Sequence, residues 1–231
     1  MLRRAILLSL LTMVCLFAAI SADEKKPQVI KGWGEVVDPD ADCTIQSEKG
    51  KVIIKVPEKN HNLAPVIGQN APRILQEVQG DFAVQVKVSG DFKPTDRSTL
   101  EGGRSFNGAG LLLWQDEKNF LRLERNSFRI PEQNLSVCYP PLLELYTDGQ
   151  YQNTNPEPQL DTFFKGGSTY LRLERRGGTV KASLSDDGKE WSVVKELRVE
   201  FPKKLKVGVA AISTSAEPFQ VEFEELKVTT K

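Results

Sequence analysis

Hydrophobic and polar residues alternate strictly in several short stretches of this chain. Residues 119–125 read NFLRLER, so that Leu121 and Leu123 occupy every second position. Almost the same pattern returns at residues 169–175 as TYLRLER, and residues 142–147 read LLELYT. Successive side chains of a β-strand point to opposite faces of a sheet. Each stretch therefore predicts a strand with one leucine face directed into a core and one face of aromatic and charged residues.

Further strands are predicted from alternation or from short apolar runs bounded by turn residues. They lie at residues 51–56, 82–88, 111–114, 179–184, 191–199, 205–212 and 219–228, and residues 70–76 lead into another strand. Residues 90–107 and 150–167 read as long polar loops, of a length that often borders binding sites. Residues 129–141 are expected to be irregular. About a dozen evenly spaced strands and no amphipathic helix predict an all-β sandwich or barrel.

The non-leucine faces of the three alternating strands supply the candidate ligand-binding residues, and we expect the three faces to share one surface. Aromatic rings stack on sugars, and arginine and glutamate hydrogen-bond hydroxyl groups, which favours a carbohydrate-binding groove. The alternative is a solvated sheet face stabilised by Arg–Glu pairs across strands. The candidate residues are Phe120, Arg122, Glu124, Glu144, Tyr146, Tyr170, Arg172 and Glu174, with Trp114 nearby.

The first 22 residues have the features of a secretory signal peptide. Two arginines are followed by an apolar run at residues 5–20 and by small residues before position 23. This run is shorter than the ~20 residues of a membrane span, so a cleaved signal is preferred to an uncleaved anchor. We expect a signal at 1–22, a flexible leader at 23–29 and a single β-sandwich domain at 30–231. The mature protein would then be secreted, or located in the periplasm or cell envelope, without a membrane span.

Charge and cysteine content narrow the functional classes. The chain has 31 Lys and Arg residues and 31 Asp and Glu residues, and its formal net charge is zero. A nucleic-acid binder needs an excess of basic residues, so no nucleic-acid partner is expected. Cys43 and Cys138 remain after removal of the signal. An oxidising compartment would permit a disulfide between them, and two separate thiols are the alternative.

Three carboxylates, Asp38, Asp40 and Asp42, are spaced two residues apart, as at the start of a calcium-binding loop. An EF-hand needs glycine at the sixth position and glutamate at the twelfth, and these positions hold Cys43 and Lys49. A turn with solvated acids is therefore preferred. A structural calcium ion (Ca²⁺) on these three residues is the weaker alternative, and no other cofactor is expected.

His61 is the only histidine of the chain. Neither a nucleophile motif nor a second group of zinc-type ligands accompanies it in the sequence. We expect it to lie in a loop and to make ordinary hydrogen bonds.

Six segments, in order, resemble a known family. They are GWGEVVDPDADC, NAPRILQ, GDFAVQVKV, GAGLLLWQDEKNFLRLER, TYLRLERRGGTVKASLSDDGKEW and LKVGVAAISTS. Over nearly all of residues 30–230 the chain resembles the domain of unknown function 1349 family, part of the concanavalin-A-like lectin and glucanase superfamily. The resemblance implies a jelly-roll sandwich of two curved antiparallel sheets, with any site on the concave sheet.

The resemblance does not imply an activity. Glucanases of the superfamily carry a Glu-x-Asp-x-x-Glu strand motif whose outer carboxylates act as nucleophile and acid, and this sequence lacks it. We therefore expect a non-catalytic, carbohydrate-binding domain rather than an enzyme. Two alternatives are a glycoside hydrolase-like enzyme using a carboxylate pair such as Glu124 and Glu174, and a cell-envelope domain that binds a protein on the same face.

Overall fold

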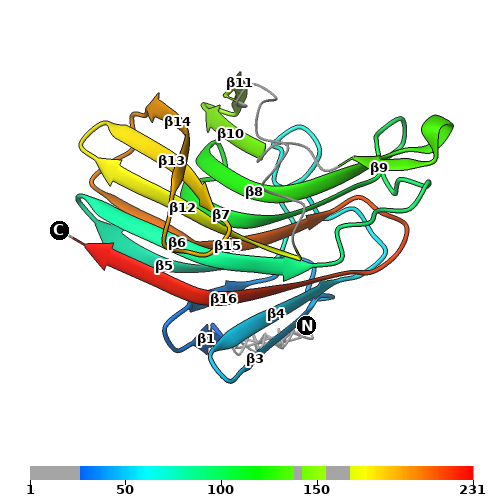
Figure 1. The fold of residues 1–231 in the computed structure, drawn as a ribbon. Helices are drawn as coiled ribbons and strands as arrows, with labels where there is room; N and C mark the ends of the chain where they lie inside the picture. Colours follow the sequence, from blue (N-terminus) through cyan, green and yellow to red (C-terminus); the bar gives the residue numbers. More distant parts are fainter. Residues whose placement is uncertain (1–26, 138–141, 155–166, 231) are drawn as a thin grey trace, which may run out of the picture.

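The computed structural model describes residues 27–137, 142–154 and 167–230, which form two antiparallel β-sheets (Figure 1). Sheet A contains, in spatial order, β1 (Val29–Ile30), β2 (Gly34–Val37), β5 (Arg73–Gln79), β15 (Lys204–Ser213), β7 (Phe106–Asp116), β8 (Asn119–Ile130), β10 (Leu142–Thr147) and β11 (Gln150–Asn153). Strand β9 (Leu135–Val137) pairs with β8. Sheet B contains β14 (Ser192–Arg198), β13 (Thr179–Ser185), β12 (Ser168–Arg176), β6 (Phe82–Gly90), β16 (Phe219–Thr230), β4 (Lys51–Val56) and β3 (Thr44–Glu48). One short 3₁₀ helix, Pro131–Gln133, precedes β9.

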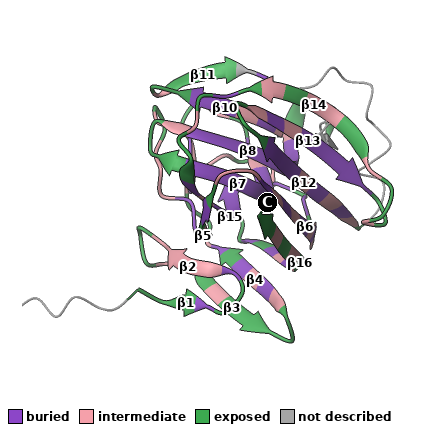
Figure 2. Cartoon of the chain, turned by 90° about the vertical axis from the view of Figure 1, so that its left-hand side faces the viewer, coloured by how far each residue is buried: buried purple, intermediate pink, exposed green. Residues whose placement is uncertain are grey.

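The main core lies between the two sheets. Leu121 and Leu123 of β8 join Leu171 and Leu173 of β12 in one buried cluster, and Figure 2 shows buried residues along the central strands of both layers. Strict alternation in β8 and β12 places every second side chain in this core. The prediction that the leucines at odd positions point inward is therefore confirmed.

A second, smaller apolar cluster lies on the outer face of sheet A. Leu112 of β7 points away from the main core, because its neighbours Leu111 and Leu113 point into it. The segment between β4 and β5 supplies Leu63, Ala64 and Ala71, which pack on this outer face. The outer face of sheet A is therefore partly covered, whereas strict alternation would leave it open to solvent.

Most of the predicted strands are confirmed, with boundaries that differ by a few residues. The strands missed by the sequence analysis are β1, β2, β3, β9 and β11. These are short strands of two to five residues that lie at sheet edges, next to an edge strand or off the main path. Strand β3, for example, has no fully buried residue and hence no apolar alternation. Residues 129–141 were expected to be irregular, yet β8 continues to Ile130 and β9 follows it.

The ends of the predicted domain differ slightly from expectation. Val29, expected in the leader, already pairs in β1 with Glu35 of β2. Trp33 is buried in the main core. The predicted signal, residues 1–22, lies outside the described residues.

Candidate functional site

The candidate residues do not share one surface. Arg122 belongs to β8 in sheet A, and Arg172 belongs to β12 in sheet B. The leucines of both strands meet in the core between the sheets, so the intervening side chains project from opposite outer faces of the sandwich. The prediction of one continuous polar and aromatic face was therefore wrong. Alternation distinguishes inside from outside, but it carries no information about which sheet a strand joins.

On the outer face of sheet A, Arg122 connects two carboxylates. Its Nε and Nη2 donate hydrogen bonds to Glu144 Oε2 at 2.9 and 2.5 Å, and its Nη1 donates to Glu124 Oε1 at 3.3 Å. The register places Glu144 of β10 directly opposite Arg122. The side chains of Arg122, Glu124 and Glu144 are only 7, 2 and 13% exposed. We call these three residues the Arg122 network.

Arg122 remains charged within this network. Burial alone would lower the pKa of its guanidinium, but the neighbouring Glu124 and Glu144 raise this pKa above its usual value. A charged arginine with two acidic partners satisfies the requirement that buried charges be paired.

Glu124 is the most strongly perturbed carboxyl of the network. Burial raises its pKa from 4.5 to about 7; Arg122 opposes this shift, and Glu144 adds to it. Its Oε2 is buried and has no hydrogen-bond partner in the described part of the chain. A Cβ at Gly108 of β7 would lie 2.7 Å from this oxygen and 2.6 Å from the ring of Phe106, so a larger residue there would displace these side chains.

The pH dependence of stability should report on Glu124. Between about pH 4.5 and 7 the folded carboxyl keeps a proton that the unfolded chain has lost, so its contribution to the free energy of unfolding falls as the pH rises through this window. The shift corresponds to up to about 3 kcal/mol. Urea unfolding at about pH 5 and about pH 8 measures it, and Glu124→Gln should remove this part of the difference.

Glu222→Gln is the matched control, because Glu222 is a partly exposed carboxylate paired with Lys51 at 2.9 Å. It should retain the pH dependence of the unsubstituted protein. Identical pH slopes for the Glu124→Gln variant and the unsubstituted protein would show that Glu124 titrates at an ordinary pKa.

Four aromatic rings continue the outer face of sheet A beside the Arg122 network. The centroids of Trp114 and Phe120 are 5.3 Å apart, those of Phe120 and Tyr146 are 4.6 Å apart, and those of Tyr146 and Tyr151 are 5.7 Å apart. The guanidinium carbon of Arg73 lies 4.7 Å from the centroid of the Trp114 ring. Trp114, Phe120 and Tyr146 are buried in the second apolar cluster, so their faces stack on one another rather than on a ligand. Tyr151, which the sequence analysis did not select, is 45% exposed.

On the outer face of sheet B, the candidate residues form a partly solvated set of ion pairs. Glu174 contacts Arg172, Arg176 and Lys181 at 3.3, 2.5 and 3.8 Å. The pKa of Glu174 is lowered, mainly by a hydrogen bond from Arg176. The guanidinium carbon of Arg172 lies 5.4 Å from the centroid of the Trp191 ring. This arrangement fits the solvated-face alternative, in which Arg–Glu pairs stabilise the sheet.

Tyr170 lies on the same side of β12 and donates a hydrogen bond from its hydroxyl to Glu225 Oε1 at 2.9 Å. A hollow of 320 Å³ lies near these ion pairs, lined by Glu174, Arg176, Thr179, Lys181 and Glu196.

The prediction that Glu124 and Glu174 could act together as the carboxylate pair of a hydrolase was wrong. The two residues project from opposite outer faces of the sandwich, whereas glycoside hydrolysis needs carboxyls within about 5–9.5 Å of each other. The separation follows from the placement of β8 and β12 in different sheets.

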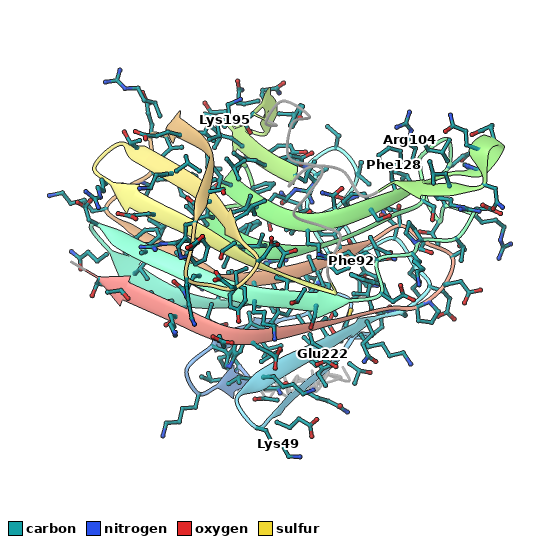
Figure 3. The ribbon with its side chains drawn as sticks, in the orientation of Figure 1. Lys49, Phe92, Arg104, Phe128, Lys195 and Glu222 are labelled. Atoms are coloured by element: carbon teal, nitrogen blue, oxygen red, sulfur yellow. The ribbon has the colours of Figure 1, made fainter. Side chains whose placement is uncertain are left out.

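The loop before β7 borders a further hollow that sequence analysis did not assign to particular residues. Arg104 lies over the ring of Phe128, with 5.1 Å between the guanidinium carbon and the ring centroid (Figure 3). Arg129 pairs with Asp96 at 2.6 Å. A hollow of 450 Å³ is lined by Asp96, Gly103, Arg104, Ser105, Arg129, Ile130, Pro131, Glu132 and Gln133. Asp96, Gly103, Arg104 and Ser105 of this lining belong to the loop predicted at residues 90–107.

The three carboxylates proposed as calcium ligands each accept a hydrogen bond from a different partner. Asp38 Oδ2 accepts a hydrogen bond from the Cys43 amide at 3.0 Å, and Asp40 Oδ2 accepts one from Asn70 Nδ2 at 2.7 Å. Asp42 Oδ2 accepts one from Lys59 Nζ at 2.7 Å. Within the described part of the chain they form no common set of ligands.

His61 lies in the segment between β4 and β5, as expected, and its side chain is fully buried. Its backbone pairs with Ser213 of β15, and its ring lies beside Asp42 and Cys43. The sequence analysis found no second group of zinc-type ligands near His61, because Asp42 and Cys43 precede it by 19 and 18 positions. Cys43 is a free thiol, and Cys138 lies outside the described residues.

None of the described residues belongs to a helix long and apolar enough to cross a membrane.

Comparison with solved structures identifies the fold. A functionally unknown protein from Saccharomyces cerevisiae is similar, with a TM-score of 0.60 and 18% identity over 86% of this chain and 97% of that chain. A mutant (K247S) of the GH43 protein BlXynB from Bacillus licheniformis is similar with a TM-score of 0.54 and 12% identity, over 85% of this chain and 39% of that chain. A xylan beta-1,4-xylosidase from Bacillus halodurans C-125 is similar with a TM-score of 0.53 and 14% identity, over 90% of this chain and 41% of that chain. The chain thus spans about two fifths of the two Bacillus chains, and the shared fold is a jelly-roll β-sandwich.

No curated protein matched the chain. One family matches residues 37–231, which include nearly every described strand. The chain therefore belongs to the family described as "Protein of unknown function (DUF1349)".

Proposed function

We propose that this protein is a non-catalytic carbohydrate-binding domain, and that the ligand is held on the outer face of sheet A at Glu144 and Tyr151. The observation that carries the proposal is the Arg122 network, which brings two carboxylates and an arginine beside a row of aromatic rings. A sugar offers hydroxyl donors and acceptors together with an apolar ring face. This is the combination that a carboxylate pair and an exposed tyrosine can bind.

Exposure narrows the contact surface to the end of the network near β10 and β11. Glu144 is partly exposed and Tyr151 is the most exposed of the four rings. Arg122 and Glu124 are buried behind them, and their charges fix the position of the Glu144 carboxylate.

The fold supports the proposal by analogy. The two Bacillus proteins described above include a xylan beta-1,4-xylosidase, and the regions that match this chain make up about two fifths of their length. A β-sandwich of this shape therefore occurs within enzymes that act on polysaccharides. Because a fold hosts many functions, the geometry of the Arg122 network carries more weight than this analogy.

A glycan array followed by titration calorimetry would test carbohydrate binding. For a polysaccharide that binds, Tyr151→Ala and Glu144→Gln should each weaken binding about tenfold, equivalent to about 1.4 kcal/mol. Tyr170→Ala and Trp191→Ala, which alter the opposite outer face, are the matched controls and should bind as the unsubstituted protein does. Failure of every polysaccharide to bind, or a loss confined to the Tyr170 and Trp191 variants, would contradict the proposal.

A hydrolase remains the second candidate because of one observation in the same network. Glu124 has a pKa of about 7, while Glu144 accepts two hydrogen bonds from Arg122. A carboxyl of raised pKa beside a second carboxyl is an arrangement used for acid and base catalysis. Release of reducing sugar from a bound polysaccharide, abolished by Glu124→Gln, would support hydrolysis. If a bound polysaccharide stays intact, hydrolysis is contradicted and only the binding role is supported.

We also propose that the protein is exported after cleavage behind Ala22. The support is the sequence alone: two arginines, an apolar run and small residues before position 23. Expression of the full chain in a secreting host, followed by amino-terminal sequencing of the mature protein, should find Asp23 as the first residue. Retention of Met1 or Leu2 at the amino terminus of the accumulated protein would rule out cleavage.

A further inference from the structure

We propose that Asp42, Cys43 and His61 form a binding site for one divalent transition metal ion of the Zn²⁺ class. The site is separate from the Arg122 network and does not depend on the proposed carbohydrate binding. Each residue offers one ligand atom, and these atoms lie within 4.8 Å of one another. Asp42 and Cys43 lie between β2 and β3, and His61 lies in the segment after β4.

The tautomer of His61 prepares Nε2 as a metal ligand. Its Nδ1 lies 3.3 Å from the backbone carbonyl oxygen of Asn70 and 4.0 Å from Cys43 Sγ. Metal-bound histidines usually donate their other ring N–H to such a carbonyl oxygen. With the hydrogen on Nδ1, the lone pair of Nε2 is available, and this fully buried atom has no hydrogen-bond partner among the described residues.

The Nε2 lone pair faces a second electron-rich atom. Asp42 Oδ1 lies 3.3 Å from Nε2, and a carboxylate oxygen is an acceptor only. Two acceptors at this distance repel each other unless a cation, either a proton or a metal ion, lies between them. Cys43 Sγ lies 3.7 Å from the same Oδ1 and donates its thiol hydrogen to it; once that hydrogen is released, the sulfur offers a third ligand.

The two separations that involve Asp42 Oδ1 match those around a tetrahedral metal ion, and all three ligand atoms lie within 4.8 Å of one another. Zinc–nitrogen and zinc–oxygen bonds of about 2.0–2.1 Å and a zinc–sulfur bond of about 2.3 Å place neighbouring ligand atoms about 3.3–3.6 Å apart. The observed distances of 3.3 Å (Nε2 to Oδ1) and 3.7 Å (Sγ to Oδ1) differ from this by a few tenths of an ångström or less. A water molecule would complete the fourth position.

The surrounding charge favours a cation. Asp38 and Asp40 lie in the same turn as Asp42, and the Asp38 carboxylate binds the Cys43 amide. Lys59 occupies Asp42 Oδ2 at 2.7 Å and leaves Oδ1 directed at the cluster. Without a metal ion, the Cys43 thiol keeps its hydrogen, which it donates to Asp42 Oδ1.

Binding therefore has a proton balance that can be measured. The thiol is protonated without metal, and formation of the metal–sulfur bond releases that proton to solvent. The ligand set also selects the ion, because thiolate and imidazole ligands suit zinc, whereas calcium needs six to eight oxygens. The metal would join the β2–β3 turn to the segment that carries Leu63 and Ala71 over the outer face of sheet A.

The test uses the chain from residue 23 onward, purified with a chelator that is then removed, and Zn²⁺ or Co²⁺ as the added probe. We expect one Zn²⁺ per chain by elemental analysis, one proton released per ion in calorimetry across several buffers, and a higher Tm with Zn²⁺. Bound Co²⁺ should show a thiolate-to-metal charge-transfer absorption. Cys43→Ser should abolish that absorption and weaken Zn²⁺ binding at least about 100-fold, since loss of outer-shell partners alone costs 10–100-fold.

Matched variants keep the test decisive. His61→Gln removes a ligand at a buried position and could disturb folding, so Asp42→Asn tests a ligand that is partly exposed. Asp40→Asn alters a neighbouring carboxylate outside the cluster, and Cys138→Ser removes the other cysteine of the mature chain; both should bind as before. Absence of Zn²⁺ binding by the folded protein, or binding that survives Cys43→Ser and Asp42→Asn, would overturn the proposal.

Discussion

Alanine in place of Arg122 is expected to lower the free energy of unfolding by about 3–5 kcal/mol, because removal of one partner leaves buried charges without compensation. The side chains of Glu124 and Glu144 stay largely buried in this variant and lose their only described cation. Folded domains are stable by only about 5–15 kcal/mol, so the loss is a large part of the total. Urea unfolding followed by circular dichroism measures it.

Arg172→Ala is the matched control, because Arg172 has the same place in the repeated LRLER segment. Its side chain is 32% exposed, and Glu174 keeps Arg176 and Lys181 as partners when Arg172 is lost. The expected loss is at most about 1 kcal/mol, as for partly exposed ion pairs. Equal losses in the two variants would mean that burial does not distinguish the two arginines.

Replacement of Phe120 by alanine is expected to cost about 3–5 kcal/mol of unfolding free energy, the usual range for a buried phenylalanine. Its ring is fully buried between Trp114 and Tyr146, so truncation leaves a cavity at the centre of the stack. The lost aromatic contacts add to the lost apolar burial. Denaturant unfolding gives the free energy, and the near-ultraviolet circular dichroism of the stacked rings should decrease.

Tyr170→Ala provides the comparison for Phe120, since Tyr170 occupies the corresponding position of the second LRLER segment and is only partly buried. We expect a clearly smaller loss. If Phe120→Ala were tolerated with a loss of less than about 1 kcal/mol, the covering segment at residues 61–72 would have to collapse onto the vacated space.

Both pairs of variants rest on one comparison between two nearly identical sequences. The LRLER segments of β8 and β12 have the same alternation and leucines in the same core. Their polar residues nevertheless differ in exposure, since Arg122 is 7% exposed and Arg172 is 32% exposed. The difference arises from neighbouring strands and from the segment that covers sheet A, and neither can be read from seven residues.

Sequence analysis was reliable for strands that bury one face and weak for strands at sheet edges. Strands β6 and β10 were predicted within a few residues because valine or leucine recurs at every second position. Strands β3 and β11 lie at the ends of their sheets. An edge strand such as β3 buries little side-chain surface, so selection of apolar residues leaves no periodic pattern to detect.

The candidate sites show the same limit. Asp42 and His61 are 19 positions apart, and no spacing rule connects them; the backbone pairing of His61 with Ser213 brings the ring to the β2–β3 turn. Tyr151 was overlooked because it lies in a stretch that reads as a polar loop. Its ring becomes significant only through the neighbouring ring of Tyr146.

The sequence by itself determined the all-β class, the inward direction of the leucines and the family, because these depend on local periodicity and on segments that stay together along the chain. The tertiary structure alone decided that Arg122 and Arg172 face opposite sides and that Trp114 and Phe120 are covered. It also decided that Asp42, Cys43 and His61 meet. Strand order and long-range pairing are set by the packing of the whole chain, and a period of two residues is the same in either sheet.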